Sequence, residues 1–331
     1  MKIFAYEVRK DEIAAFSAAA AKYHVDITTS TLVPTLENAA LAAGCDGVTI
    51  LGQGRIDRQL LERYRVLGIR YLSTRTIGSN HIDLQAAHDL GIQVCSADYP
   101  PNGVADFTVM MILMCLRHYK QALWRGQVND FSLTGLQGRE MKDLTIGIIG
   151  TGRIGAQVVR NLSGFGCRIL AYDLRRNPAV EPQVTYVDFD TLLAQSDVIT
   201  LHMPLLDSNR HIINRESIAK MRDGVVIVNC SRGELADIEA LIEGIETGKI
   251  GALGMDTVEG DEGIIHADHR VDILPNRNWF YLHQFRNVIM TQHMAFYTDA
   301  AVSSMVDCGI GGICQMAAGE SCPTELTGPV Q

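Results

Sequence analysis

Short apolar runs alternate with amphipathic stretches along the first hundred residues. The opening run, Ile3-Phe4-Ala5-Tyr6, has the β-branched and aromatic character of a strand, and the stretch that follows it spaces its apolar residues as a helix does. The pattern predicts strands at residues 2–7, 25–27, 47–50, 71–73 and 93–95, and helices at 11–22, 37–42, 57–67 and 84–90. Such alternation is typical of a parallel sheet with helices on both faces, so we expect a complete small α/β domain here.

A second α/β pattern follows a proline pair. Pro100 and Pro101 end the first domain, and Asn102 is placed to cap one long helix over residues 103–119; residues 124–142 look irregular. Further strands are expected at 145–149, 168–172, 184–187, 198–202, 225–229, 252–255 and 288–290, with helices at 190–194, 215–220, 238–247 and 298–317. We expect the last helix to return to the first domain. The predicted division is therefore residues 1–100 plus 299–331 as one domain, and 101–298 as the other.

A glycine-rich turn follows the first strand of the second domain. Gly150, Gly152 and Gly155 have the spacing G-x-G-x-x-G. In dinucleotide-binding turns the first glycine permits a tight turn, the second lets the backbone approach a pyrophosphate, and the third lets the helix lie close to the strand. Glycines at this spacing also occur in ordinary turns, so the motif needs support from its surroundings.

That support comes from Asp173, at the end of the next predicted strand and about twenty residues further on. A carboxylate there accepts hydrogen bonds from the adenosine ribose and repels a 2′-phosphate, so we expect NAD rather than NADP. Arg175 and Arg176 lie just beyond and are the residue type that accommodates the extra phosphate.

Composition narrows the class of protein. The chain has 331 residues and a formal net charge of -9, without a dense block of Lys and Arg, which argues against a nucleic-acid or anionic-membrane partner. The N-terminus does not resemble a signal peptide, and the apolar run at 107–116 is shorter than the roughly 20 residues of a membrane-spanning helix. The eight cysteines form no C-x-x-C pair. We expect reduced thiols in a cytoplasmic protein.

Three residues after predicted strands fit the reduction of a 2-oxo acid. Arg232, Glu259 and His293 follow different strands of one parallel sheet, whose carboxyl ends meet along one edge. Arg232 can grip a carboxylate through two parallel hydrogen bonds. His293 can exchange a proton near neutral pH, and Glu259 can favour its charged form. Taken singly, each could equally be a salt-bridge partner, a solvated acid or a structural histidine.

Other sequence features have weaker chemical interpretations. Residues 75–80 and 97–103 are loops after strands, and either could bind a ligand or be a plain turn. His266, His269 and Asp272 have a loosely metal-like spacing, but a polar loop explains them at least as well, and we expect no metal.

The chain resembles the D-2-hydroxyacid dehydrogenase family, in particular its D-lactate dehydrogenase branch, and also phenyllactate and 2-hydroxyisocaproate dehydrogenases. The resemblance rests on motifs in the family's order: Arg75-Thr-Ile-Gly, Tyr99-Pro-Pro-Asn, Gly150-Thr-Gly-Arg-Ile-Gly, His202-Met-Pro-Leu, Ser231-Arg-Gly, Asp256-Thr-Val-Glu-Gly and His293-Met-Ala-Phe-Tyr-Thr. It implies an α/β fold of two Rossmann-like doubly wound parallel-sheet domains, one binding substrate and the other NAD, separated by an active-site cleft.

The resemblance also implies particular site residues. Arg232, Glu259 and His293 would be catalytic. NAD would be held, beside the glycines, by Arg153, Ile154, Asp173, Met203, Pro204, Asn209, Cys230, Ser231 and Asp256. The backbone of Ile77 and Gly78, with Tyr99, would seat the substrate carboxylate, while Leu51, Phe296 and Tyr297 would wall its side-chain pocket. Homodimers built through the region of residues 103–119 are usual in the family.

The substrate is expected to be pyruvate, reduced by NADH to (R)-lactate. Leu51 is apolar, which disfavours dicarboxylic acids, and it is smaller than a tyrosine, which leaves room for a branched or aromatic side chain. Branched and aromatic 2-oxo acids are therefore the alternative substrates. A protein of another class, an NAD(H)-sensing regulator, is also compatible with these motifs.

Overall fold

The computed structural model describes residues 1–274 and 276–328 of the chain. It divides into two compact units, Met1–Pro100 with Tyr297–Gln331, and Pro101–Phe296. In the described residues, each unit is built on a parallel sheet, as the alternating pattern predicts.

The sheet of the first unit has the order β2-β1-β3-β4-β5 among the described residues. Its strands are β1 (Lys2–Ala5), β2 (Asp26–Thr29), β3 (Gly47–Ile50), β4 (Tyr71–Thr74) and β5 (Gln93–Cys95). The helices are α1 (Ile13–Tyr23), α2 (Arg58–Val66), α3 (Leu84–Asp89) and α11 (Asp299–Ala317), with 3-10 turns η1 (Lys10–Glu12) and η2 (Ala39–Ala42).

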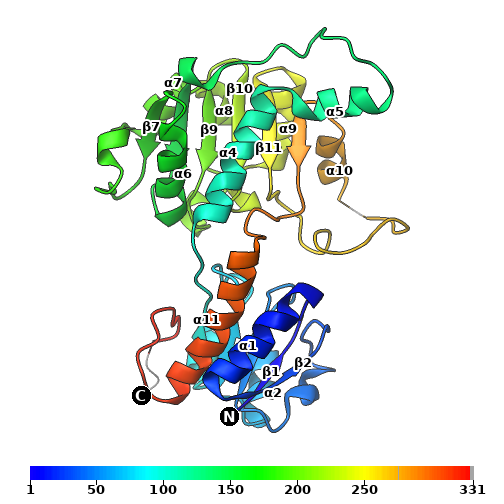
Figure 1. Cartoon of the computed structure of the whole chain (residues 1–331), viewed down its shortest axis with the longest axis vertical. Coiled ribbons are helices and arrows are strands. Elements are labelled where there is room, and N and C mark those ends of the chain that lie inside the picture. Colours follow the sequence, from blue (N-terminus) through cyan, green and yellow to red (C-terminus); the bar gives the residue numbers. More distant parts are fainter. Residues whose placement is uncertain (275, 329–331) are drawn as a thin grey trace. The chain divides into compact units, whose positions relative to one another are not determined.

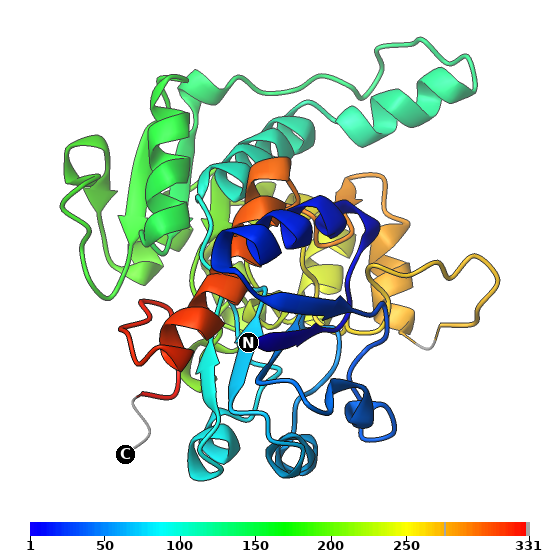
Figure 2. The same ribbon diagram turned by 60° about the horizontal axis from the view of Figure 1, so that its bottom comes forward.

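Successive residues of β1, and Tyr6 just after it, pack alternately into two different cores. Ile3 and Ala5 belong to the apolar cluster beneath α1 and α11, whereas Phe4 and Tyr6 belong to the cluster beneath α2 and α3. Figures 1 and 2 both show α1 and α11 side by side, although they come from opposite ends of the chain. The last helix therefore packs in the first unit.

Helix α11 has the length and apolar composition that a membrane crossing would need, and among the described residues no other helix does. Val306, Ile310 and Ile313 are fully buried in the cluster shared with α1 and β1. The apolar character of α11 is thus accounted for by the core of the first unit.

The sheet of the second unit runs β12-β11-β10-β9-β6-β7-β8 in the part of the chain that the structure describes. Its strands are β6 (Thr145–Ile149), β7 (Arg168–Tyr172), β8 (Thr185–Tyr186), β9 (Val198–Leu201), β10 (Val225–Asn229), β11 (Ile250–Met255) and β12 (Val288–Met290). The order reverses direction at β6, and β6 is followed by the glycine turn. Ligands of open α/β sheets bind at such a reversal.

Helices cover both faces of this second sheet. They are α4 (Asn102–Leu116), α5 (Tyr119–Gln127), α6 (Arg153–Ser163), α7 (Phe189–Gln195), α8 (Arg215–Lys220), α9 (Ile238–Glu246) and α10 (Arg277–His283), with 3-10 turns η3 (Met141–Asp143), η4 (Glu181–Gln183), η5 (Asp207–Asn209) and η6 (Gly233–Leu235). Helices α4 and α6 pack together on one face (Figure 1). Leu192, Ile218 and Leu241, from α7, α8 and α9, share a core cluster with the strands.

Some local predictions were wrong. The helix expected over 103–119 is two helices, because His118 has a φ of 49° and ends the α-helical path before α5 begins. Pro101, not Asn102, is the N-cap of α4. Helix α5 extends into the stretch expected to be irregular, and α10 was not predicted. The helix expected at 37–42 is only the 3-10 turn η2.

Candidate active site

The turn between β6 and α6 has the geometry that a pyrophosphate requires. Gly150 has a φ of 93°, a conformation that residues with a Cβ rarely adopt. A Cβ on Gly155 would lie 2.0 Å from the carbonyl oxygen of Gly150, so only glycine lets α6 lie so close to the turn. Gly152 is the N-cap of α6, and a Cβ there would meet no described atom within 4 Å. The first turn of α6, which contains Arg153 and Ile154, thus opens onto free space suited to an anion.

Asp173 lies at the end of β7, directly beside this turn. Its Oδ2 accepts hydrogen bonds from the backbone N–H of Thr151 (2.6 Å) and the Thr151 hydroxyl (3.1 Å), and its Oδ1 accepts one from the N–H of Arg175 (3.0 Å). Tyr186 and Asn177 hold Thr151 in turn, through its Oγ1 (2.9 Å) and its carbonyl oxygen (2.7 Å). Asp173 is therefore held rigidly where the resemblance places the adenosine ribose. Sequence reasoning did not identify Tyr186 or Asn177.

The loop after β9 is organised by Asn209. Its side-chain N–H donates to the carbonyl of Pro204 (2.8 Å) and to the sulfur of Met203 (3.4 Å), while its Oδ1 accepts from the N–H of Leu206 (2.8 Å). The preceding His202 is buried, which lowers its pKa to about 3, and it packs against Gly155. Burial therefore keeps His202 neutral, and Met203, Pro204 and Asn209 form one ordered loop beside the glycine turn.

Arg232 follows β10 in a loop held by Asn229. The Asn229 side chain accepts from the N–H (3.0 Å) and hydroxyl (2.8 Å) of Ser231 and donates to the carbonyl of Arg232 (2.7 Å). A Cβ on Gly233 would lie 2.3 Å from the carbonyl carbon of Val258, so this loop contacts the loop after β11 directly. Burial raises the pKa of the Cys230 thiol well above its usual range, which leaves that thiol protonated and unreactive.

Asp256, at the end of β11, fixes the loop that carries His293. One carboxylate oxygen accepts from the hydroxyl of Thr291 (2.6 Å) and the N–H of Met294 (2.9 Å), and the other accepts from the N–H of Ala295 (2.8 Å). Asp256 is 1% exposed, so these bonds are shielded from water. In this structure Asp256 thus positions His293, a role that the sequence did not reveal.

The carboxylate beside His293 comes from Asp261 rather than from Glu259, the residue expected there. Asp261 Oδ2 lies 3.9 Å from Nδ1 of His293. Glu259 Oε1 instead binds Arg210 (2.6 Å) and Nε2 of His211 (2.8 Å). The N–H of Asp261 donates a hydrogen bond to the carbonyl of Val258, so the loop 258–261 forms a turn. Because of this turn, the side chains of Glu259 and Asp261 meet different partners. Sequence spacing alone does not distinguish them.

Burial dominates the electrostatics of this pair. It lowers the pKa of His293 to about 4, with Arg232 and His266 adding to the effect and Asp256 opposing it. Burial also raises the pKa of Asp261 to about 6. Without substrate, the pair therefore favours its neutral form, with a proton on Asp261 at mildly acidic pH.

The histidines considered as metal ligands have other partners. Nε2 of His266 lies 3.2 Å from the carbonyl oxygen of His293, and the two imidazole centroids are 6.2 Å apart. His269 pairs with Asp272 through Nδ1 at 2.8 Å. Within the described ranges, no cluster of three or more His, Cys, Asp or Glu side chains could hold a metal ion. His266 belongs to the surroundings of His293, which sequence reasoning missed.

The remaining predicted substrate residues are divided between the two units. Phe296 is the last residue of the second unit, and its ring centroid lies 6.4 Å from that of His293. Leu51, Ile77, Gly78, Tyr99 and Tyr297 belong to the first unit. The Thr76 hydroxyl donates to the carbonyl of Gly78 (2.6 Å) and thereby fixes the turn at Ile77 and Gly78. The ring of Tyr297 lies under the guanidinium of Arg9, 5.1 Å from its centroid.

Comparison with known proteins agrees with these features. The family model described as "D-isomer specific 2-hydroxyacid dehydrogenase, NAD binding domain" matches residues 109–295. An aromatic 2-oxoacid reductase of Clostridium sporogenes is 44% identical over 311 residues, which cover 93% of each chain.

Solved structures are similar over nearly the whole chain. The pyruvate reductase of Chlamydomonas reinhardtii superposes with a TM-score of 0.91 at 33% identity, covering 98% of both chains. D-lactate dehydrogenase from Escherichia coli superposes with a TM-score of 0.88 at 35% identity, covering 98% of this chain and 100% of the other. The chain therefore belongs to the D-isomer specific 2-hydroxyacid dehydrogenases, NAD-binding oxidoreductases of which residues 109–295 carry the NAD-binding domain.

Proposed function

We propose that this D-2-hydroxyacid dehydrogenase uses NADH to reduce 2-oxo acids with a bulky, aromatic or branched side chain to (R)-2-hydroxyacids. The grouping of Arg232, Asp261 and His293 beyond the adjacent strands β10, β11 and β12 carries the proposal for the reaction. It supplies a cation for the substrate carboxylate and a proton for the alkoxide. When bound, NADH supplies the hydride that C2 of the substrate accepts.

Arg232 is proposed to grip the substrate carboxylate with its guanidinium, since a planar fork matches two carboxylate oxygens. Within the first unit, the backbone N–H groups of Ile77 and Gly78, with Tyr99, are proposed to bind a carboxylate, as the resemblance implies. Ile77 is 41% exposed in a turn fixed by Thr76, so this turn lies at the surface of the first unit. These contacts orient the 2-oxo group for reduction.

His293 is proposed to donate its Nε2 proton to the developing alkoxide, because Nδ1 is the atom that faces Asp261. Asp261 takes the role that the sequence had suggested for Glu259: it returns a proton to Nδ1 or supports the imidazolium charge. Its 3.9 Å separation from Nδ1 requires only a small approach to form a hydrogen bond.

Two observations favour a bulky apolar side chain on the substrate: the name of a relative and the apolar character of Leu51. The Clostridium sporogenes relative, with 44% identity, is named for aromatic 2-oxo acids. Leu51, Phe296 and Tyr297 are proposed to wall the side-chain pocket, where an apolar surface favours an aromatic or branched group. Pyruvate, expected from the family branch, is the competing substrate.

The test is NADH oxidation with phenylpyruvate, followed by chiral chromatography of the product and with NADPH as the control coenzyme. We expect NADH-dependent formation of (R)-phenyllactate and little reaction with NADPH, because the Asp173 carboxylate, proposed to bind the adenosine ribose, would repel a 2′-phosphate. Formation of the (S)-acid, or faster turnover with NADPH, would contradict the proposal. No turnover of any 2-oxo acid would favour the NAD(H)-sensing alternative.

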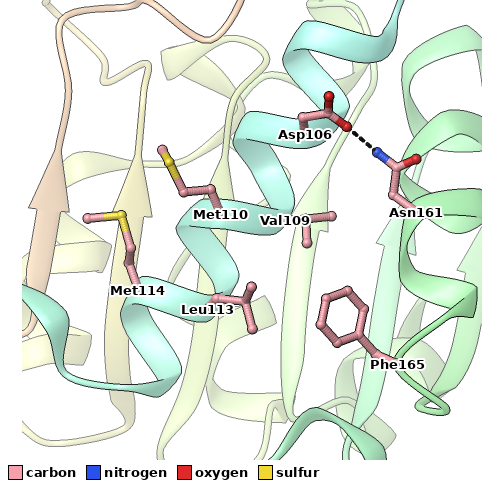
Figure 3. Close-up of a pocket in the computed structure, with 7 residues that line it drawn as sticks. All are labelled: Asp106, Val109, Met110, Leu113, Met114, Asn161 and Phe165. Carbon is pink, nitrogen blue, oxygen red and sulfur yellow. Dashed lines mark hydrogen bonds between the residues drawn. The ribbon is translucent and has the colours of Figure 1, made fainter.

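We also propose a homodimer through α4 and α6. A hollow on this face of the second unit is lined by Asp106, Val109, Met110, Leu113, Met114, Asn161 and Phe165 (Figure 3). Met110 is 40% exposed there although it is apolar. Helix α5 and the stretch after it add exposed apolar side chains, among them Trp124 (64%) and Phe131 (78%). Exposed apolar surface of this kind favours a second copy of the chain.

Analytical ultracentrifugation tests the dimer. The molar mass measured for the wild-type protein is expected to be twice that of one chain. The double variant M110E/M114E should sediment as a monomer with unchanged circular dichroism, because two charges would be buried in the interface. The control, V66E, changes another exposed apolar residue, in the first unit, and should stay dimeric. A wild-type monomer at micromolar concentration would refute the proposal.

A further inference from the structure

Glu7 is a buried carboxylate surrounded by the backbone of another loop. Only 3% of the residue is exposed. Its Oε2 accepts hydrogen bonds from the N–H groups of Leu51 and Gly52, the latter at 2.8 Å, and its Oε1 accepts from Gln53 (2.9 Å) and Gly54 (3.0 Å). Consecutive N–H groups thus converge on one side chain, which is an anion-binding arrangement of backbone dipoles. Glu7 fills it from within the chain.

The backbone conformation of both partners is specialised for this contact. Glu7 has a φ of 56°, which is uncommon for a residue with a long side chain, and Gly52 has a φ of 92°. A Cβ on Gly52 would lie 2.9 Å from the ring of His81, and one on Gly54 would lie 2.6 Å from Val33. The loop is therefore pressed between these side chains and the Glu7 carboxylate. Losing the carboxylate would leave the backbone N–H groups of residues 51–54 without their acceptor.

The same segment also anchors the second loop proposed to bind substrate. Arg75 is fully buried, and its Nη2 donates to the carbonyl oxygens of Tyr6 (3.0 Å) and Glu7 (3.1 Å). Its Nε donates to the buried carboxylate of Glu12 (2.9 Å). Arg75 directly precedes the turn of Ile77 and Gly78. Residues 6–12 are thus a common base for the loop that contains Leu51 and for the turn proposed to bind the carboxylate.

From these contacts we propose that Glu7 is a positioning residue that determines side-chain specificity by holding the loop 51–54, and with it Leu51, in place. The inference rests on the proposed function, in which Leu51 walls the side-chain pocket. Glu7 is not proposed to contact the reacting atoms. It acts through the position of Leu51, so its loss affects a bulky substrate more than pyruvate, whose methyl group fills little of the pocket.

The first variant, Glu7→Gln, keeps the size of the side chain and removes its charge. A carboxamide offers one oxygen where the carboxylate offers two, and its NH2 group faces N–H donors instead of accepting from them. We expect kcat/KM for phenylpyruvate to fall about tenfold, mainly through KM, while pyruvate changes less than about threefold and the KM for NADH is unchanged. The control Glu37→Gln removes an exposed acid of the same unit and should change none of these values.

The second variant, Glu7→Gly, separates positioning from folding. Glycine accepts the positive φ freely, and the missing side chain leaves a space that formate can enter. We expect amide hydrogen exchange of residues 51–54 to accelerate about tenfold in this variant. Formate, but not chloride at equal ionic strength, should restore both the protection and the ratio of kcat/KM for phenylpyruvate to that for pyruvate.

The possible results separate the inference from the proposed function. Wild-type turnover of 2-oxo acids tests the function, and only the variants test Glu7. If the ratio of kcat/KM for phenylpyruvate to that for pyruvate is unchanged in Glu7→Gln and Glu7→Gly, the inference is overturned while the proposed function stands. Equal losses for both substrates, accompanied by a changed KM for NADH, would show a merely structural role and would overturn it as well. Without any wild-type turnover, function and inference fall together.

Discussion

At the scale of single residues, the site depends on which acid of a short loop faces His293. Glu259 and Asp261 are two positions apart, and either could serve a histidine by charge alone. The structure pairs Glu259 with Arg210 and His211 and brings Asp261 to 3.9 Å from His293. Because burial raises the pKa of Asp261 to about 6 and lowers that of His293 to about 4, the pair can hold a transferable proton in mildly acidic solution.

This assignment predicts the pH dependence of reduction. Reduction consumes a proton, so kcat/KM should be highest where the pair is protonated and should fall as pH rises through about 6, the pKa of Asp261. In Asp261→Asn the anion that supports the imidazolium is lost. This disfavours the charged histidine and should move the falling limb to lower pH, with kcat reduced about 10- to 100-fold.

The matched control is Glu259→Gln, which removes an acid from the same loop. In this variant kcat/KM should fall over the same pH range as in the wild type. A shifted limb in Glu259→Gln, together with a wild-type profile in Asp261→Asn, would restore the assignment made from the sequence.

At the scale of elements, glycines fix how closely the turn after β6 approaches its neighbours. Gly155 and Gly152 belong to one motif, yet their surroundings differ. Gly155 presses against the carbonyl of Gly150, whereas Gly152 faces open space. The first should therefore serve packing and the second coenzyme access.

Two alanine variants separate these roles. Gly155→Ala places a methyl group 2.0 Å from the Gly150 oxygen and should destabilise the chain by about 1–3 kcal/mol, seen as a lower midpoint in thermal denaturation. Gly152→Ala should leave the midpoint unchanged but weaken NADH binding about tenfold, measured by fluorescence titration, because the methyl group occupies space needed by the pyrophosphate. Equal effects of the two variants on stability would contradict this division.

Most strands, and the helices that alternate with them, could be predicted from the sequence because their apolar periodicity reflects burial on both faces of a sheet. Helix α10 was not predicted, because residues 277–283 include several aromatic residues and bury only Leu282. The break at His118 depends on a single backbone angle that its neighbours do not signal. Similarly, Arg232 and His293 could be found from their places after strands, but the direction of Asp261 depends on the turn at Val258.

At the scale of the whole molecule, the chain forms two units that each enclose their own apolar cores. The first uses both ends of the chain, since α11 packs with α1 in one of its cores. The second contains the glycine turn, Asp173 and the family's NAD-binding domain. Coenzyme binding should therefore stabilise the second unit directly.

Differential scanning calorimetry can test this division. At NADH concentrations about 100 times Kd, binding stabilises the unit that binds it by about 2.7 kcal/mol. For a unit of this size the shift is about 5–10 °C. We expect NADH to raise the temperature of one unfolding transition and to leave the temperature of a second transition unchanged. One cooperative transition that moves as a whole would contradict independent unfolding of the two units.

Whether the enzyme reduces bulky 2-oxo acids with NADH is decided by the kcat/KM values for phenylpyruvate, 2-oxoisocaproate and pyruvate, measured side by side. We expect kcat/KM for phenylpyruvate or 2-oxoisocaproate to exceed that for pyruvate by about tenfold or more, since a side chain that fills an apolar pocket contributes about 1–3 kcal/mol. A kcat/KM for pyruvate above both would contradict the proposed specificity and identify a D-lactate dehydrogenase.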